Sequence, residues 1–175
     1  MKNIFIGFIL IFLNFNLTLG SSKIGLFPDF VGYIVMIGGL VEMAEKSSIF
    51  MKVKPYVTGM AIYTGILYLL DLFGISVSLG ALTYVLAITS MAVSLYISYN
   101  IVMGVIDIEE KYNMILNGRK LKSTWTLLAV FNVLTFVSLL IPFIAIIFII
   151  VSIVVVIYFL IIFNSSKNLY LALSS

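Results

Sequence analysis

The chain consists of six long apolar runs that are separated by short polar gaps. A helix of about 20 apolar residues is long enough to cross the hydrocarbon core of a bilayer. The pattern therefore predicts an all-α, polytopic membrane protein, a single helical domain over residues 1–175 with six transmembrane helices. The expected spans lie near residues 4–21, 26–44, 56–73, 81–106, 123–140 and 143–163.

Two stretches with almost no charge, residues 55–106 and 123–166, are each predicted to fold back as a helical hairpin. As single helices they would be more than twice as long as a hydrocarbon core is thick. Glycines and serines at residues 74–80 place the first turn, because small polar residues and glycine favour turns. Pro142 places the second turn near residues 139–143.

Basic residues occur almost entirely in alternate gaps, before the first run, after the sixth, and at residues 46–54 and 111–122 between them. The residues in this set are Lys2, Lys46, Lys52, Lys54, Lys111, Arg119, Lys120, Lys122 and Lys167. Only Lys23 lies in one of the other gaps. Because cytoplasmic loops collect lysine and arginine, the pattern predicts a multipass protein of the plasma membrane with both termini inside.

The first run has two interpretations. A signal peptide would use residues 4–13 as its apolar region, with Thr18 and Gly20 as the small residues before the cleavage site. A retained helix would instead continue along the whole run, although Asn14 and Asn16 weaken it. We favour the retained helix, because the cleavage site is poor.

The composition agrees with a membrane protein and limits the chemistry. Hydrophobic residues make up 63% of the chain and charged residues 10%, far below the charged content of a soluble domain. The net charge of +3 favours anionic headgroups, but no basic stripe is long enough to indicate a nucleic-acid partner. Cysteine and histidine are absent, so disulfides, thiolate chemistry and the commonest metal ligands are excluded. We therefore predict no metal, no cofactor and no enzymatic activity.

Two sets of small residues are predicted at helix contacts. Gly32, Gly38 and Gly39 lie on the second span, and Ser90, Ser94 and Ser98 form a stripe along one face of the fourth. In membranes small residues allow helix backbones to approach closely. The serine stripe has a second interpretation, the polar lining of a pore.

Three residues are candidates for a cation or ligand site. Asp29 and Asp71 are predicted near the outer face, and Tyr33 follows Asp29 by one helical turn. Two close carboxylates cannot both ionise cheaply, so the pair would hold a proton or attract a cation. The alternative is that Asp29, next to Pro28, caps the second helix, while Asp71 is an interfacial carboxylate.

The start of the second span carries a short motif. Pro28, Asp29, Phe30, Gly32 and Tyr33 form a Pro-Asp-Phe-x-Gly-Tyr stretch that opens a glycine-containing helix. Together with residues 47–50, this segment resembles a family of small, uncharacterised multipass membrane proteins of Gram-positive bacteria. The resemblance implies membrane location and draws attention to Asp29, but it implies no activity and no substrate.

Two functions fit these patterns. The first is a subunit for small-solute transport or binding, acting in the lipid bilayer as a homo-oligomer or with a membrane-protein partner. The alternative is a non-transporting accessory, assembly or immunity protein that holds another membrane protein by helix packing. A cavity reached from outside and lined by Asp29, Asp71 or tyrosines would favour the first function, and a solid bundle the second.

Overall fold

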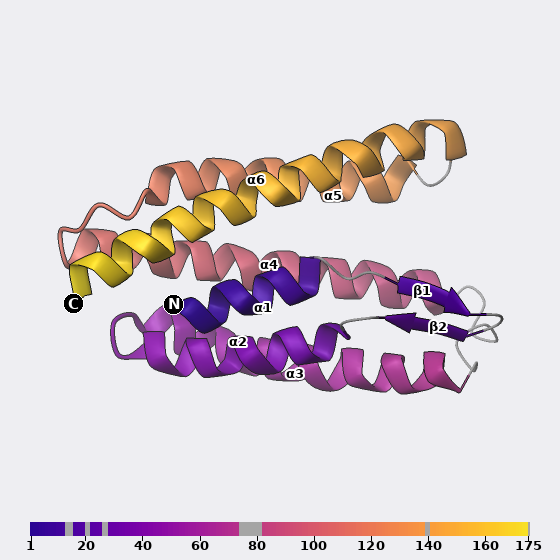
Figure 1. Cartoon of the computed structure of the whole chain (residues 1–175), viewed down its shortest axis with the longest axis horizontal. Helices are drawn as coiled ribbons and strands as arrows, with labels where there is room; N and C mark the ends of the chain where they lie inside the picture. Colours follow the sequence, from indigo (N-terminus) through magenta and orange to yellow (C-terminus); the bar gives the residue numbers. More distant parts are fainter. Residues whose placement is uncertain (13–15, 20–21, 26–27, 74–81, 139–140, 175) are drawn as a thin grey trace. The chain divides into compact units, whose positions relative to one another are not determined.

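The computed structural model of the chain describes residues 1–12, 16–19, 22–25, 28–73, 82–138 and 141–174. Within them the chain forms six helices and one antiparallel pair of strands (Figure 1). In chain order they are α1 (Lys2–Phe12), β1 (Asn16–Leu19), β2 (Ser22–Gly25), α2 (Asp29–Ala44), α3 (Ser48–Leu72), α4 (Leu82–Lys111), α5 (Gly118–Ser138) and α6 (Pro142–Ser174). They group into two compact units, Met1–Ile97 and Ser98–Ser175, and α4 contributes residues to both.

Three helices of the described residues are long and apolar enough to cross a bilayer. They are Tyr84–Lys111 of α4, all of α5, and Phe143–Leu173 of α6. α1 and α2 have only 11 and 16 residues, which correspond to about 16 and 24 Å of helix. α3 has 25 residues, which include Lys52, Lys54 and Asp71, and it is not among these three helices. The three long apolar helices, α4, α5 and α6, support the predicted helical membrane class.

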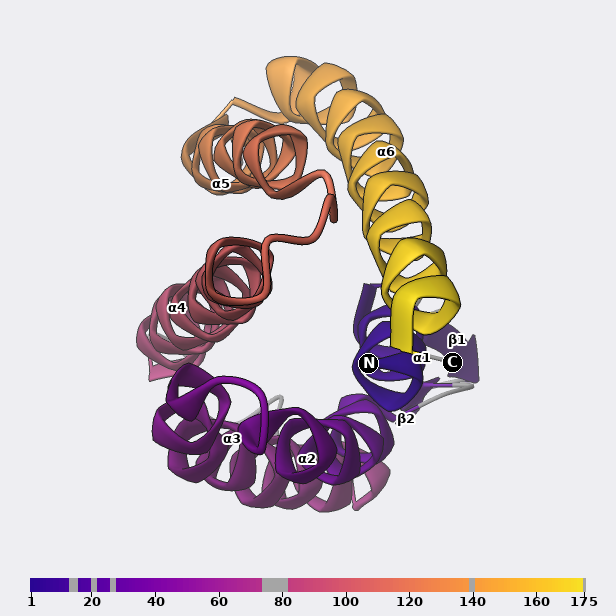
Figure 2. The same cartoon turned by 90° about the vertical axis from the view of Figure 1, so that its left-hand side faces the viewer.

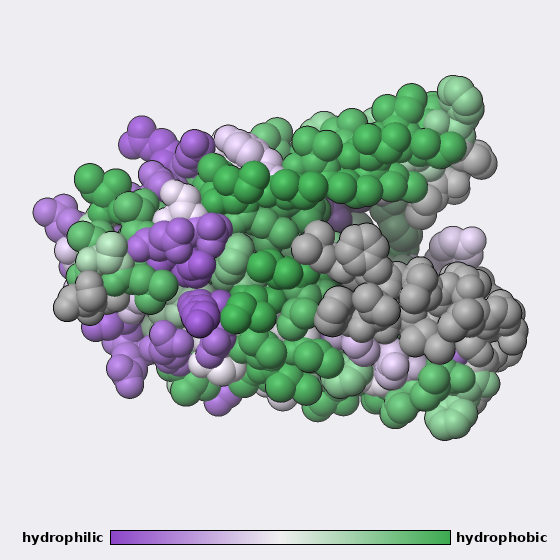
Figure 3. All heavy atoms as spheres, in the orientation of Figure 1, coloured by the Kyte–Doolittle hydropathy of each residue, from purple (hydrophilic) through white to green (hydrophobic). Residues whose placement is uncertain are grey.

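The exposed surface also has the distribution expected in a bilayer. Hydrophilic side chains gather where α2 turns into α3 and where α4 turns into α5, while apolar side chains cover much of the remaining helix surface (Figure 3). On α6, Phe143 is 81% exposed and Ile150 is 59% exposed. Such a surface is stable in contact with lipid chains rather than with water.

In the first unit α2 lies between α1 and α3 (Figure 2). α1 packs antiparallel to α2 through glycines that bring the two backbones together. A Cβ atom built on Gly7 would lie 2.8 Å from the carbonyl oxygen of Gly32, and one on Gly32 would lie 2.7 Å from Cγ1 of Ile11. One on Gly39 would lie 2.7 Å from the backbone nitrogen of Ile4. Since real Cβ atoms do not approach so closely, only glycine fits at these three contacts.

The three glycines of α2 that were predicted at helix contacts have different surroundings. Gly32 and Gly39 face α1, and both are buried. Gly38, which was also expected at a helix contact, is instead exposed, and the nearest atom to its Cβ position would be Nδ2 of Asn3 at 3.8 Å. Gly7 on α1 is a contact residue that the sequence pattern did not reveal.

The first predicted span, residues 4–21, is not a continuous helix. α1 ends at Phe12, and residues 16–19 and 22–25 pair as antiparallel strands, with Asn16 opposite Gly25. The polar and β-branched residues after Phe12 explain the difference, because asparagine and serine side chains compete for backbone hydrogen bonds. The second predicted span, 26–44, corresponds closely to α2, which begins at Asp29.

The loop predicted at residues 46–54 is mostly helical. α3 begins at Ser48, eight residues before the predicted start of its span, because Ser47 caps it: its hydroxyl accepts a hydrogen bond from the Ile49 N–H at 3.4 Å. The helix continues through Lys52 and Pro55. It ends at Leu72, and the predicted turn at residues 74–80 lies outside the described residues.

In the second unit the connection between α4 and α5 differs from the prediction. The fourth span was predicted to end at residue 106, but the helix continues to Lys111. Asn113 has a φ of 50°, a left-handed conformation that asparagine tolerates better than most residues. Gly118 begins α5, so this span starts five residues before its predicted boundary at residue 123.

α5 and α6 form the predicted hairpin. α5 ends at Ser138 and α6 begins at Pro142, so the chain reverses within the predicted residues 139–143, of which 139 and 140 lie outside the described residues. The rings of Phe131 and Phe148 lie 6.4 Å apart between the two helices. α6 continues to Ser174, well past the predicted end at residue 163.

Candidate functional site

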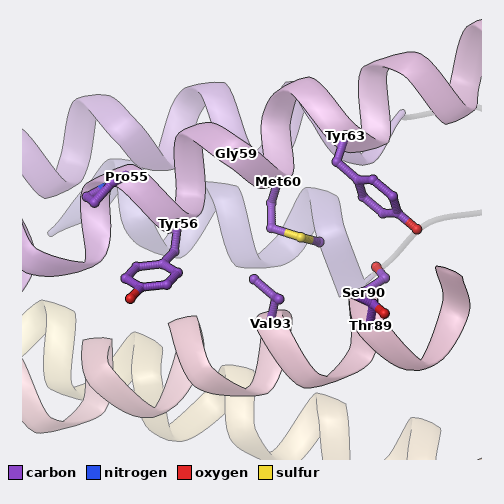
Figure 4. Close-up of a pocket in the computed structure, with 8 residues that line it drawn as sticks. All are labelled: Pro55, Tyr56, Gly59, Met60, Tyr63, Thr89, Ser90 and Val93. Atoms are coloured by element: carbon purple, nitrogen blue, oxygen red, sulfur yellow. The ribbon is translucent and has the colours of Figure 1, made fainter. Parts of the chain in front are cut away.

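A cavity of about 480 Å³ lies between α3 and α4 in the first unit (Figure 4). From α3 it is lined by Pro55, Tyr56, Gly59, Met60 and Tyr63, and from α4 by Thr89, Ser90 and Val93. The α3 residues recur at steps of three and four, so they share one face of the helix. Most of this lining is apolar.

Part of the cavity is the open space beside Gly59. A Cβ atom built on Gly59 would meet no atom within 4 Å, so the space beside this glycine is open. Thr89 and Ser90 on the opposite helix are also small. Larger residues at these positions would fill the space between the helices.

Two tyrosines that line the cavity, one at each end, connect α3 to α4. The rings of Tyr56 and Tyr96 lie 4.8 Å apart at one end. At the other end the Tyr63 hydroxyl donates a hydrogen bond of 2.9 Å to the carbonyl oxygen of Leu86. These contacts hold the helices together on both sides of the open space.

The polar groups of the cavity are hydroxyls rather than charges. The Thr89 hydroxyl donates to the carbonyl oxygen of Val85 at 2.8 Å, within its own helix. Figure 4 shows Ser90 and Thr89 beside the hydroxyl of Tyr63. No carboxylate or amino group lines the cavity among the described residues. The arrangement suits an uncharged or mostly apolar molecule that uses one or two hydrogen bonds.

The predicted cation-site residues lie elsewhere. Asp29 is in the first turn of α2, and Pro28 occupies the N-cap position without a side-chain capping bond. Phe30 packs on Tyr68 with ring centroids 5.7 Å apart, and Asp71 follows Tyr68 by one turn of α3. Asp29 and Asp71 are therefore at the same end of the α2–α3 pair, and a cation site there stays a prediction. Neither lines the α3–α4 cavity.

Tyr33, the third predicted site residue, is buried rather than open to a ligand. Its side chain is 2% exposed. It interacts with Ser94 of α4 and, on its own helix, with Asp29. Its position is that of a residue that connects α2 to α4 inside the first unit.

The three serines of the predicted stripe have different surroundings. Ser90 lines the α3–α4 cavity, and Ser94 interacts with Tyr33. Ser98 is 1% exposed, and its hydroxyl accepts a hydrogen bond of 2.9 Å from the indole N–H of Trp125 on α5. Two of the serines thus lie at helix contacts and the third faces an open space.

No protein-family model, no curated protein and no solved structure matches the chain. The described residues also contain no group of three or more acidic, histidine or cysteine side chains that could hold a metal ion. The assignment of a site therefore depends on the geometry of the α3–α4 cavity.

Sequence reasoning missed most of the residues that line this cavity. Pro55 was expected in a loop, and Tyr56 at the boundary of a span. The available signal was the spacing of Tyr56, Gly59 and Tyr63 on one helix face, with the serine stripe on the next helix. That signal could not show that the two faces meet.

Proposed function

We propose that the chain is a multipass protein of a bacterial plasma membrane that crosses the bilayer six times, with both termini in the cytoplasm. The concentration of nine of the ten basic residues in alternate gaps between the apolar runs supports this topology. The packing of the first unit agrees with it, because the Met1 ammonium lies 3.3 Å from Oε1 of Glu42, near the α2–α3 turn. α1 and β1 together make the first crossing, and β2, which runs antiparallel to β1, belongs with α2 to the second. β2 lies against α3, and protein contact allows non-helical backbone at membrane depth.

Cysteine accessibility tests this topology on a chain with no native cysteine. Phe73, at the end of α3, is 72% exposed, and Lys52, near the start of the same helix, is also exposed. A membrane-impermeant thiol reagent should label a Phe73→Cys variant in intact cells. It should label Lys52→Cys only after the cells are permeabilised. The reverse pattern would contradict the topology.

For the function, we propose that the protein is a non-enzymatic binding or transport subunit for a small, mostly apolar solute, which it holds between α3 and α4. The observation that carries this proposal is the cavity of about 480 Å³, which has the size of typical ligand sites. Pro55 directly follows Lys54, and Tyr63 lies eight residues, about 12 Å of helix, farther along. With Lys54 at the inner interface, the cavity reaches from that interface toward the bilayer centre.

The alternative function, an accessory protein that acts by helix packing, has less support. The small residues that would make such a contact are already used inside the chain. Gly32 and Gly39 are covered by α1, and Ser98 is bonded to Trp125. Only Gly38 among these residues is exposed. A partner would therefore have to dock on larger side chains.

Photolabelling with a small apolar aryl diazirine tests the binding function in nanodiscs. The probe should label Met60 and Val93, and an excess of the same molecule without the diazirine should compete with this labelling. A Gly59→Phe variant should reduce the competed labelling at least tenfold, because the Cβ position of residue 59 opens onto free space that its ring would fill.

The matched control is Ile62→Phe, on the same helix but outside the cavity, where the native side chain is 61% exposed. The competed labelling of this variant should equal that of the native chain. Labelling that is not competed, or that is equal in Gly59→Phe and the native chain, would show that the probe partitions from lipid without binding in the cavity.

A further inference from the structure

The connection between α4 and α5 presents an exposed apolar side chain among cations. Ile115 is 74% exposed and Tyr112 is 39% exposed, whereas the adjacent Leu116 is fully buried. Four basic side chains around them are exposed: Lys111, Arg119, Lys120 and Lys122. We call Tyr112, Ile115 and these four residues the α4–α5 surface.

The backbone of this connection is held in one conformation, so the exposure of Ile115 is a property of the fold. Asn113 and Asn117 both have positive φ angles, of 50° and 60°. The Met114 N–H donates to the carbonyl oxygen of Glu109 at 3.0 Å. The side-chain amide of Asn117 donates to the Ser165 hydroxyl at 3.3 Å. With Leu116 buried between these contacts, Ile115 must point outward.

The basic residues of α5 lie at positions where a cation destabilises the helix. Arg119, Lys120 and Lys122 lie in the first turns of α5, where the positive end of the helix dipole disfavours cations. Glu109 offsets part of this effect, since its carboxylate accepts a hydrogen bond of 2.6 Å from the Gly118 N–H. None of the three cations forms an ion pair within the described residues. An anionic partner outside the chain would explain their position.

We propose that the α4–α5 surface binds the headgroups of anionic phospholipids, with the Ile115 side chain inserted beneath them. Lysine and arginine next to a membrane attract anionic lipid. An apolar side chain among cations is the pattern of a segment that lies in the bilayer interface. A soluble phosphate would use the cations but would leave Ile115 in water. The inference concerns a lipid site and does not depend on the α3–α4 cavity.

The single tryptophan of the chain gives a direct measurement. Trp125 follows Lys122 by three residues on α5, and its side chain is half-buried. The protein is reconstituted in mixed vesicles of phosphatidylglycerol and phosphatidylcholine, and the bromines are carried by one of the two lipids at a time. Bromines quench the fluorescence of nearby tryptophan. The quenching should show that the lipid around Trp125 is enriched in phosphatidylglycerol by about fivefold or more. The attraction of anionic lipid to a single basic residue corresponds to about that factor. High salt should reduce the preference.

Charge removal then tests the location of the site. The triple variant Arg119→Gln, Lys120→Gln, Lys122→Gln should lose the preference for phosphatidylglycerol. The matched variant Lys46→Gln, Lys52→Gln, Lys54→Gln removes the same charge at the α2–α3 turn and should retain it. Equal quenching by the two lipids in the native chain, or equal loss in both triple variants, would overturn the proposal.

A label at residue 115 tests the insertion separately. An Ile115→Cys variant that carries an environment-sensitive nitrobenzoxadiazole group should emit at shorter wavelength in phosphatidylglycerol vesicles than in phosphatidylcholine vesicles. Adding the three glutamine substitutions of α5 should abolish this difference. Emission typical of water in both lipids would overturn the insertion of Ile115.

Discussion

Replacing Gly39 with alanine should lower the free energy of unfolding by about 2 kcal/mol, the usual cost of overpacking a close contact. The added Cβ would lie 2.7 Å from the backbone nitrogen of Ile4 and 3.1 Å from Cβ of Asn3. Because backbone atoms cannot rotate away, α1 must shift away from α2. Thermal unfolding in detergent, followed by circular dichroism, measures the loss.

The neighbouring glycine provides the control. Gly38→Ala makes the same chemical change one position earlier, where the Cβ would meet only Nδ2 of Asn3 at 3.8 Å. It should be neutral or should stabilise the helix by about 0.5 kcal/mol, since alanine has the higher helix propensity. The two substitutions should therefore have opposite signs. Equal effects would contradict the packing of α1 on α2.

A second large effect is expected where α5 begins. Gly118→Ala should destabilise the protein by about 2 kcal/mol. Its φ lies outside the left-handed region, so the backbone itself accepts alanine, but the new methyl group would overlap the Glu109 carboxylate and lie 2.8 Å from Cγ1 of Ile106. The carboxylate would then lose its hydrogen bond from the residue 118 N–H. Chemical denaturation in detergent measures the change.

A double-mutant cycle identifies the cause. Glu109→Ala alone should cost about 1.5 kcal/mol, the value of a hydrogen bond to a charged group. The double variant Glu109→Ala, Gly118→Ala should cost little more, because the overlapping carboxylate is gone and the Ile106 side chain can rotate. Strongly coupled neighbours show this departure from additivity. Additive costs in the cycle would show that Glu109 is not what excludes a side chain at residue 118.

The sequence predicted those parts of the fold that depend on local signals. α2 agrees with its predicted span because Pro28 and Asp29 mark its start. The α5–α6 reversal was predicted from Pro142, which cannot continue a helix from the preceding residues. The predicted start of the fourth span at residue 81, placed by the glycines and serines of residues 74–80, lies one residue before the observed start of α4 at Leu82.

The parts that were predicted wrongly depend on competition between local and tertiary effects. α3 passes through Lys52 and Pro55 because Ser47 caps it before them, although lysine and proline together suggest a loop. α1 stops at Phe12 because the asparagines and serines that follow favour other backbone conformations, although the run is uncharged. Hydropathy averages do not detect either effect.

The candidate site was less predictable than the fold. The serine stripe on α4 was visible, but whether Ser90 faces a helix or an open space depends on how far α3 and α4 are displaced along each other. That register depends on tertiary contacts such as the hydrogen bond of Tyr63 with Leu86. Tyr33 was predicted near a ligand because of its position beside Asp29, yet burial against Ser94 is a tertiary property.

The length of α1 has a consequence for how the chain enters the membrane during synthesis. With 11 residues it is about half as long as a hydrocarbon core is thick. Under the six-span topology proposed above, we therefore do not expect such a helix to be released into lipid on its own. A Cβ atom on Gly7 of α1 would lie 2.8 Å from the Gly32 carbonyl oxygen and 2.9 Å from Cβ of Met36 on α2, so the two helices are in close contact. With that topology, we expect α1 and α2 to enter the bilayer together, as a packed pair.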